Sequence, residues 1–331
     1  MVKSVPASVL VVRTGAIGDV VNALVFASAL KDAHPATTIG WVTHDQARPL
    51  LVDNPVVDRV HHWPRKSGLA GFRRVVGELR AARYDLAVDL QRIAKSAALA
   101  RLAGIPRRIG LPRSQAKEGS WLLNNEHLPA ASDDQHMLDR YLAAARYLGV
   151  AVDAPRWSLP ADRDAEMRIA ERLAGARPVL VNLGASKPKN RWTDDGFAEV
   201  AERLAESHDA PVLLTGGPGD VELFQAVRDR TRASSGIEDW VGATSLAEFA
   251  ALTRHARTMV TCDTGPMHIA VSQGLKVAAL FGPGNPSRTG PYGEGHRLVR
   301  PPEGETSTSA IRPDDVLAAV QALLAATPRE S

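Results

Sequence analysis

The stretch Met259-Val-Thr-Cys-Asp-Thr-Gly-Pro-Met-His268 decides the fold. Its apolar start predicts a buried strand, residues 263–265 predict a polar turn, and Pro266 suits the first turn of a helix that continues to Gln273. A helix that begins at a strand end presents free backbone N–H groups and a positive dipole end, which attract phosphate. His268 is a candidate donor to that phosphate. The alternative is an ordinary capped helix with a packing histidine.

The composition of the 331 residues indicates a water-soluble protein of two ordinary domains. Hydrophobic residues make up 44% and charged residues 23%, and no apolar run approaches the length of a membrane span. The single cysteine, Cys262, excludes an intrachain disulfide framework and a cysteine zinc cluster. The N-terminus shows no signal-peptide pattern, so we expect a cytoplasmic protein.

Apolar strands alternate with helical patterns along the whole chain, which predicts parallel sheets covered by helices. In the first half we expect strands at 8–12, 38–43, 59–63, 85–90 and 107–110, and helices at 20–30, 47–52, 72–82, 93–102 and 136–148. The pattern lapses at 149–160, the expected linker. In the second half we expect strands at 179–183, 211–215, 258–261 and 276–281, and helices at 164–174, 195–206, 220–231, 246–255 and 313–325.

Two polar segments follow strands of the first half, where ligands of such sheets bind. Gly15-Ala-Ile-Gly18-Asp19 lacks the spacing of a dinucleotide fingerprint. Its Asp19 is either a helix N-cap or a general base at the mouth of a cleft. The segment from Asp89 through Gln91 to Lys95 and Ser96, with further basic residues after it, suits an anionic acceptor. A solvated basic face is the alternative, and the lack of interleaved aromatic residues argues against nucleic acid.

Two loops of the second half are further candidate phosphate or ribose contacts. Asn182-Leu-Gly-Ala-Ser-Lys-Pro-Lys-Asn-Arg-Trp192 does not have P-loop spacing, yet Ser186, Lys187 and Lys189 could wrap a phosphate. Trp192 is expected to be a packing anchor. The second loop, from Thr215 to Glu222, is a glycine-rich turn followed by the carboxylates of Asp220 and Glu222, which could accept from ribose hydroxyls. No histidine, cysteine or carboxylate grouping has metal-ligand spacing.

These stretches together resemble the bacterial heptosyltransferases that build the lipopolysaccharide inner core, glycosyltransferase family 9. The matching pieces occur in family order: Arg13-Thr-Gly-Ala-Ile-Gly-Asp19, Asp89-Leu-Gln with Lys95-Ser96, Gly184-Ala-Ser ending in Arg191-Trp192, and Asp263-Thr-Gly-Pro-Met-His268 followed by Phe281-Gly-Pro283. The resemblance covers nearly the whole chain. It implies an α/β protein of GT-B type, with two Rossmann-like domains whose parallel sheets face a central cleft.

The resemblance also implies a role for each domain. Residues 1–155 would bind the acceptor and residues 156–331 the nucleotide sugar, with the last helix free to pack back on the first domain. Asp19 would be the catalytic base. The donor-binding residues would be Ser186, Lys189, Asp220, Glu222, Asp263, Thr264, Gly265 and His268. The acceptor-binding residues would be Gly18, Gln91, Lys95 and Ser96.

The activity that the resemblance implies is inverting transfer of a heptose or related sugar from an ADP-sugar to a lipopolysaccharide-type acceptor. It implies no metal and no cofactor, since ADP-heptose is a substrate. The partners would be the nucleotide sugar and an anionic glycolipid, with peripheral contact at the cytoplasmic face of the inner membrane and no nucleic acid. A non-catalytic nucleotide-sugar-binding protein and a nucleotide-sugar epimerase are the alternatives.

The sequence departs from the family pattern at positions that bear on donor and acceptor. Asn190 stands where the family often has lysine, Arg92 where it often has glycine, and Ala185 where it often has a hydroxyl residue.

Overall fold

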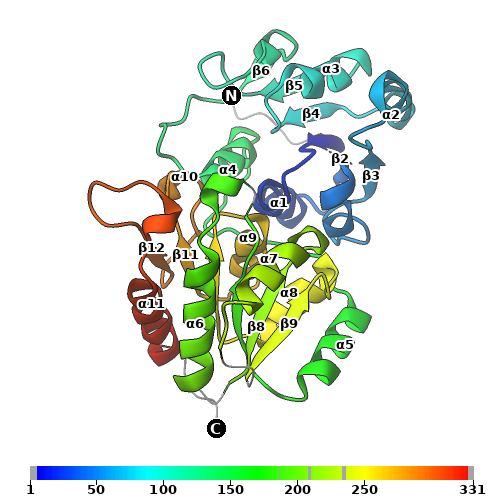
Figure 1. Cartoon of the computed structure of the whole chain (residues 1–331). Helices are drawn as coiled ribbons and strands as arrows, with labels where there is room; N and C mark the ends of the chain where they lie inside the picture. Colours follow the sequence, from blue (N-terminus) through cyan, green and yellow to red (C-terminus); the bar gives the residue numbers. More distant parts are fainter. Residues whose placement is uncertain (1–5, 186, 208–209, 233–235, 327–331) are drawn as a thin grey trace. The chain divides into compact units, whose positions relative to one another are not determined.

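The computed structural model describes residues 6–185, 187–207, 210–232 and 236–326. The chain divides into two compact units, Met1–Ala161 (unit 1) and Asp162–Ser331 (unit 2). The division follows Ala161, at the end of the expected linker, rather than residue 155. Figure 1 shows strands and packed helices in both units, as the alternating pattern predicts.

The described part of unit 1 holds a parallel sheet of six strands in the order β3-β2-β1-β4-β5-β6. The strands are β1 Ser8–Val12, β2 Thr38–Thr43, β3 Arg59–His62, β4 Leu86–Asp89, β5 Arg107–Gly110 and β6 Glu126–His127. In the central pair, Val12 of β1 lies beside Asp89 of β4. The polar segments after these two strands therefore leave the sheet side by side.

The helices of unit 1 cover this sheet. They are α1 Ile17–Ala33, α2 Gly68–Ala82, α3 Ala94–Leu102 and α4 Met137–Tyr147, with 3-10 turns η1 Asp45–Leu50 and η2 Ser120–Leu122. Helix α1 packs against α4, and α2 packs against α3. A core cluster joins Val75, Val76 and Leu79 of α2 to Leu99 of α3 and to apolar strand residues. This packing fixes the strand ends from which the polar loops emerge.

The described part of unit 2 repeats the design with six parallel strands in the order β12-β11-β10-β7-β8-β9. The strands are β7 Val179–Asn182, β8 Val212–Gly216, β9 Ile237–Val241, β10 Thr258–Cys262, β11 Val277–Leu280 and β12 Arg297–Val299. Strand β10, from the stretch that decides the fold, is central and fully buried. Its neighbours are β7 and β11, so the loops after these strands are adjacent.

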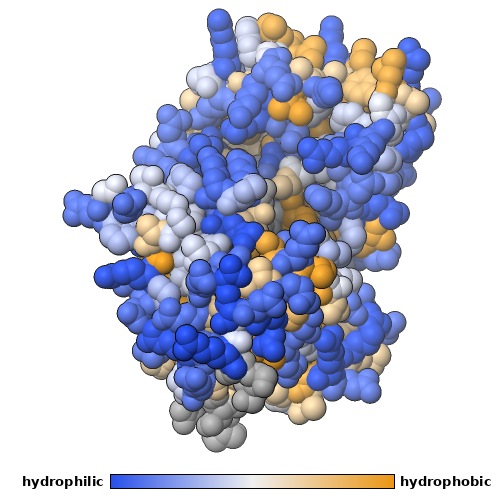
Figure 2. Space-filling model, in the orientation of Figure 1, coloured by the Kyte–Doolittle hydropathy of each residue, from blue (hydrophilic) through white to orange (hydrophobic). Residues whose placement is uncertain are grey.

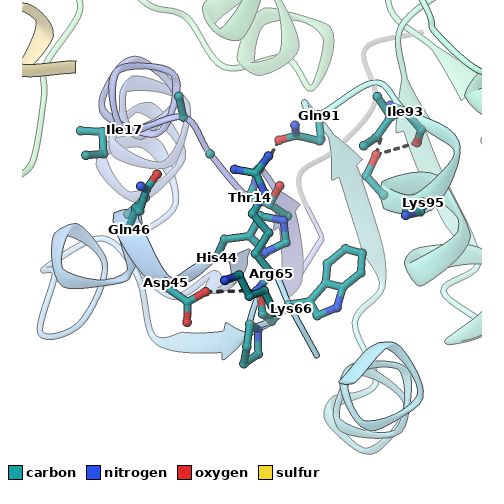
Figure 3. A pocket seen from close by; sticks show the side chains of 16 residues that line it. Thr14, Ile17, His44, Asp45, Gln46, Arg65, Lys66, Gln91, Ile93 and Lys95 are labelled. Atoms are coloured by element: carbon teal, nitrogen blue, oxygen red, sulfur yellow. Dashed lines mark hydrogen bonds between the residues drawn. The ribbon is translucent and has the colours of Figure 1, made fainter. Parts of the chain in front are cut away.

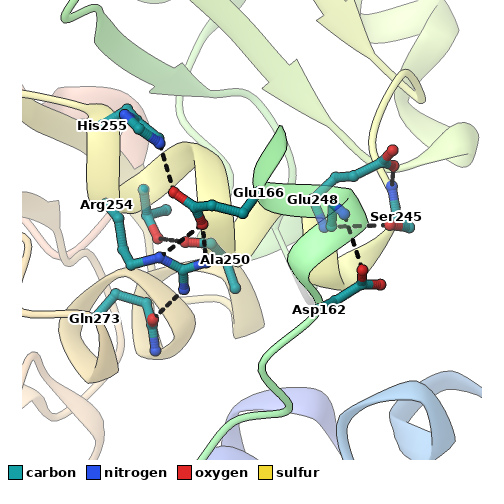
Figure 4. Close-up of polar contacts among 10 residues, drawn as sticks. Asp162, Glu166, Ser245, Glu248, Ala250, Arg254, His255 and Gln273 are labelled. Atoms are coloured by element: carbon teal, nitrogen blue, oxygen red, sulfur yellow. Dashed lines mark hydrogen bonds and ion pairs between the residues drawn. The ribbon is translucent and has the colours of Figure 1, made fainter. Parts of the chain in front are cut away.

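The helices of unit 2 are α5 Arg163–Leu173, α6 Asp194–Ser207, α7 Val221–Arg228, α8 Leu246–His255, α9 Gly265–Ser272, α10 Pro286–Thr289 and α11 Pro313–Ala326, with turns η3 Pro188–Asn190, η4 Pro218–Asp220 and η5 Thr308–Ala310. Helix α11, the last helix, packs on α6 and on β10, β11 and β12 of its own unit. Helix α5 is held to α8 by polar contacts, in which Glu166 pairs with Arg254 and His255 (Figure 4).

The predicted elements differ from the structure chiefly at sheet edges. The sequence does not predict strands β6, β9 and β12, because they are short and contain no continuous run of buried apolar residues. The helix expected at 47–52 is the 3-10 turn η1, which contains Pro49. Proline removes a helix hydrogen bond and clashes with the preceding turn, so a regular α-helix is disfavoured there.

The face of the molecule seen in Figure 2 is largely polar. No described helix is long and apolar enough to cross a membrane. Figure 2 shows hydrophilic residues over most of the visible face, with hydrophobic residues in small groups.

Candidate active site

In unit 1, the loops that follow β1 and β4 are joined by hydrogen bonds. The amide of Thr14 donates to Oε1 of Gln91 at 3.0 Å. The guanidinium of Arg13 donates through Nη1 to the carbonyl of Leu90 at 2.8 Å. The amide of Leu90 donates in turn to the carbonyl of Val12 at 3.1 Å. The predicted base and the predicted acceptor segment are thereby fixed relative to each other.

Asp19 lies in the first turn of α1 and forms an ion pair with Arg13. Its other carboxylate oxygen accepts a hydrogen bond of 3.4 Å from the hydroxyl of Tyr141 on α4. The Asp19 side chain is 32% exposed, whereas that of Arg13 is 7% exposed. A carboxylate that is anchored from behind by a buried cation and still reaches solvent can accept a proton from a bound molecule.

Arg13 and Tyr141 stay in single protonation states around neutral pH. Burial raises the pKa of Tyr141, and the nearby guanidinium groups of Arg13 and Arg92 oppose that rise without cancelling it. Burial lowers the pKa of Arg13, but the nearby Tyr141 and Asp19 outweigh this effect, and the pKa is raised above its ordinary value. Tyr141 is therefore a neutral hydrogen-bond donor to Asp19, and Arg13 is a permanent cation.

A cavity of about 910 Å³ opens at the carboxyl ends of β1 to β4, next to this pair (Figure 3). Its lining includes Gln91, Lys95 and Ser96, three of the residues that the resemblance implies for acceptor binding. Gly18, also predicted there, is buried in the first turn of α1, and the adjacent Ile17 lines the cavity instead.

The cavity also gathers cationic and aromatic residues that belong to none of the motifs described above. They are His44, Trp63, Arg65 and Lys66. Asp45 offsets part of this charge, and one of its oxygens accepts the backbone amide of Arg65 at 3.1 Å. The run Trp63-Pro-Arg-Lys66 directly follows β3, so a search for basic residues after every strand would have found it.

Ser96, although it borders the cavity, is bonded within its own loop. Its side chain is buried, and its hydroxyl donates to Oδ1 of Asp89 at 2.8 Å. The same Asp89 oxygen accepts the backbone amides of Gln91 at 3.1 Å and of Arg92 at 3.2 Å. Burial raises the pKa of Asp89 to about 6, against the effect of these donors. We conclude that Asp89 and Ser96 shape the segment that carries Gln91 and Lys95.

In unit 2, the described donor-side candidates gather at the carboxyl ends of neighbouring strands. Lys189 is in the turn after β7, Asp220 and Glu222 follow β8, and Asp263 to His268 follow β10. The sheet order β10-β7-β8 makes these loops adjacent. Ser186, the remaining candidate, lies outside the described residues.

The residue Thr264 has extended backbone angles and precedes the first turn of α9, where Gly265 and Pro266 follow as predicted. Among the described contacts, the side-chain amide of Asn190 donates through Nδ2 to Oδ2 of Asp263 at 3.4 Å, which joins the loops after β7 and β10. His268 is only 8% exposed. His268 lies in the first turn of α9, and because it is buried it also contributes to packing.

Asp220 lies against the glycine of the neighbouring loop. Its carboxylate accepts the amide of Gly217 at 2.7 Å, and a Cβ placed on Gly184 would come within 2.7 Å of Oδ2. Glycine at 184 therefore permits the close approach of the loops after β7 and β8. Glu222 is exposed in the first turn of α7.

Trp192 is a packing anchor, as predicted. Its ring lies edge-on to Phe197 with centroids 5.2 Å apart, and its indole N–H donates to the carbonyl of Ile311 at 3.0 Å. Within the described ranges, no group of three or more histidine, cysteine, aspartate or glutamate residues is arranged to hold a metal ion.

Comparison with known proteins agrees with these features. Residues 72–312 match glycosyltransferase family 9 (heptosyltransferase). The lipopolysaccharide core heptosyltransferase OpsX of Haemophilus influenzae is 27% identical over 289 residues, which are 87% of this chain and 82% of that protein.

Solved structures show the same architecture. Escherichia coli ADP-heptose LPS heptosyltransferase II superposes with a TM-score of 0.82 at 25% identity, covering 96% of this chain and 98% of that one. A family 9 glycosyltransferase of Veillonella parvula gives a TM-score of 0.86 at 21% identity, covering 99% of each chain, which is a likeness of fold. The two parallel sheets are thus of the predicted GT-B type, and the match over residues 72–312 places this chain in glycosyltransferase family 9, the heptosyltransferase family.

Proposed function

We propose that this glycosyltransferase moves a heptose from ADP-heptose onto a lipopolysaccharide core acceptor, with inversion at the anomeric carbon and without a metal ion. The names of its relatives supply the donor and the acceptor. The observation that carries the proposal is a solvent-reaching carboxylate, Asp19, anchored by buried Arg13 beside a cationic cavity. That arrangement suits deprotonation of a hydroxyl on an anionic substrate.

The proposed reaction is a single displacement. The acceptor hydroxyl oxygen attacks the anomeric carbon of the heptose as the bond from that carbon to the diphosphate oxygen breaks. Asp19 takes the hydroxyl proton, and the electron pair of the broken bond leaves with ADP. Arg13 keeps Asp19 oriented, and Tyr141 donates to the carboxylate oxygen that is not paired with Arg13. Attack from the face opposite the leaving group inverts the anomeric configuration.

In this proposal the departing diphosphate is stabilised by unit 2. The N-terminus of α9, with the amides of its first turn and the positive end of its dipole, is a suitable site for phosphate. Lys189 and His268 would add donors, and Asp263 would accept from sugar hydroxyls. Asp220 and Glu222, after β8, would contact the nucleoside. Ser186 remains a proposed phosphate contact outside the described residues.

The acceptor would bind in unit 1. Gln91 and Lys95 line the cavity as proposed contacts, and Arg65 and Lys66 are cationic neighbours in the same lining. Phosphate and carboxylate groups of a lipopolysaccharide core would match this charge. Because that acceptor is a glycolipid, we also propose peripheral contact with the inner-membrane surface.

The two alternative functions are less well supported. A non-catalytic binding protein does not need a partly exposed carboxylate that forms an ion pair with a buried arginine, as Asp19 does with Arg13. An epimerase is disfavoured because the chain matches a family of glycosyltransferases.

The proposal is tested by mixing the purified protein with ADP-heptose and a heptose-free lipopolysaccharide core acceptor, with and without excess EDTA. Mass spectrometry is expected to detect the heptosylated acceptor at the same rate in both samples, because helix N-termini and basic side chains replace a metal. A product that disappears with EDTA and returns with a divalent ion would remove metal independence. Release of free or epimerised sugar without transfer would remove the transferase assignment.

A further inference from the structure

His44 lines the cavity of unit 1 directly after the end of β2. In the sheet, β2 lies between β1 and β3. The backbone amide of His44 donates to the carbonyl of Thr14, in the loop after β1, at 2.9 Å. Its ring lies beside that of Trp63, in the loop after β3, with centroids 5.2 Å apart. His44 therefore joins the loop that leads to Asp19 to the basic loop that follows β3 (Figure 3).

One hydrogen bond fixes where the proton of the His44 ring lies. The ring atom Nδ1 is 2.5 Å from the carbonyl oxygen of Trp63. A carbonyl oxygen can only accept a hydrogen bond, so Nδ1 must carry the proton and donate it. In the neutral ring the other nitrogen, Nε2, then holds a lone pair and is a hydrogen-bond acceptor. The protein thus sets both the orientation of the ring and its tautomer.

The atom Nε2 of His44 is left unused by the protein. Within the described part of the chain it makes no hydrogen bond, and it is not one of the buried polar atoms that lack a partner. His44 is half-buried and borders the cavity, so this nitrogen meets the solvent there. Arg65, Lys66 and Lys95 of the same lining can only donate hydrogen bonds. Nε2 offers an uncharged acceptor beside them.

We propose, on the basis of the function proposed above, that Nε2 of His44 accepts a hydrogen bond from a hydroxyl of the acceptor sugar and so orients that sugar for transfer. The cationic side chains of the cavity would bind the anionic groups of the acceptor, and His44 would recognise the sugar itself. A site built to hydrogen-bond a substrate hydroxyl discriminates against an analogue that lacks it, because the polar group of the protein is then left unpaired. His44 is therefore a specificity-determining residue.

The loop after β3 does not depend on His44 alone. The amide of Trp63 donates to the carbonyl of Thr43 at 2.8 Å. The amide of Arg65 donates to the carboxylate of Asp45 at 3.1 Å. Both contacts remain when His44 is substituted, so we expect the loop to keep its position. An effect of such a substitution on the acceptor can then be assigned to the imidazole ring.

Two substitutions separate the roles of the two ring nitrogens. His44→Asn keeps an N–H donor near the position of Nδ1 and removes Nε2, whereas His44→Gln reaches the position of Nε2 and gives up Nδ1. We expect His44→Asn to raise the KM for the acceptor roughly twofold to tenfold, the effect of losing a neutral hydrogen bond. The acceptor KM of His44→Gln should lie closer to that of the wild type. The affinity for ADP-heptose and the melting temperature should be unchanged in His44→Asn.

A histidine that only anchors the loop predicts the reverse order, with a raised KM in His44→Gln and a native KM in His44→Asn. That result would overturn the inference. His34→Asn is the matched control, because His34 is exposed at the end of α1, before β2 and near the amino ends of the strands. Its acceptor KM should equal that of the wild type, and an equal rise at this remote position would contradict the assignment to the cavity.

Modified acceptors identify the group that His44 binds. Acceptors that each lack one sugar hydroxyl, other than the hydroxyl that is glycosylated, and an acceptor without phosphate groups are compared on the wild-type enzyme and on His44→Asn. One of the deoxy acceptors should abolish the difference in KM between the two enzymes, and the phosphate-free acceptor should preserve it. A difference that disappears with the phosphates, or that survives in every deoxy acceptor, would contradict the inference. Failure of the wild-type enzyme to transfer heptose to the unmodified acceptor would instead contradict the proposed function, so the two failures are distinguishable.

Discussion

The Asp19→Asn enzyme is expected to turn over roughly 100- to 10,000-fold more slowly than the wild type, the usual contribution of a positioned base. Asparagine keeps the size of the side chain but cannot take the acceptor proton. The KM for the acceptor and the affinity for ADP-heptose should change little, because neither depends on that proton. Steady-state kinetics with a heptose-free acceptor and calorimetry with the donor measure both quantities.

Loss of the ion pair with Arg13 needs a control. Arg13 is buried, and removing one partner of a buried pair is destabilising, so the melting temperature of Asp19→Asn must be recorded. Asp32→Asn is the matched variant: Asp32 lies at the other end of α1 and pairs with Arg156 at 3.0 Å on the surface. Its turnover should equal that of the wild type. Near-normal turnover by folded Asp19→Asn would remove Asp19 from the mechanism.

The His268→Ala enzyme is expected to bind ADP-heptose and ADP roughly ten- to a hundredfold more weakly, because a hydrogen bond to a charged group contributes about 1.5–3 kcal/mol. Adenosine, which lacks phosphates, should bind equally to the variant and the wild type. Calorimetric titration with the three ligands gives the comparison.

The burial of His268 makes the stability of this variant part of the test. The side chain of His268 is only 8% exposed, so its loss removes buried contacts. We therefore expect a lower melting temperature in addition to weaker phosphate binding. His255→Ala provides the reference. His255, the last residue of α8, contacts Glu166 of α5 at 2.6 Å and lies before the amino end of β10, away from the carboxyl ends of the strands. If His268→Ala melts early but keeps the native ranking of ADP, ADP-heptose and adenosine, His268 is a packing residue only.

The core of each unit could be predicted because its signal is local. Strand β10 is a continuous buried run, and Pro266 marks the first turn of α9, so residues 258–272 follow directly from sequence pattern. Strands at the sheet edges could not be predicted in the same way. In β9, buried Ile237 and Trp240 flank the exposed Glu238 and Asp239, a pattern that is equally typical of a loop.

The candidate residues were predictable one at a time, whereas their pairing was not. Tyr141 and Asp19 are separated by 122 positions, and only the packing of α4 against α1 brings them together. The resemblance implies that Ser96 contacts the acceptor, and only the structure shows that its hydroxyl donates to buried Asp89. Arg92 stands where the family often has glycine, and only the structure shows that its φ of +62° is a conformation that glycine adopts more readily.

The anomeric configuration of the product tests the central claim most directly. The new glycosidic bond, formed from ADP-heptose of one defined configuration, is examined by NMR of the anomeric proton and carbon before any further processing. Direct displacement with Asp19 as base predicts the configuration opposite to that of the donor. A product that retains the donor's configuration would require a second displacement at the same carbon and would contradict the account.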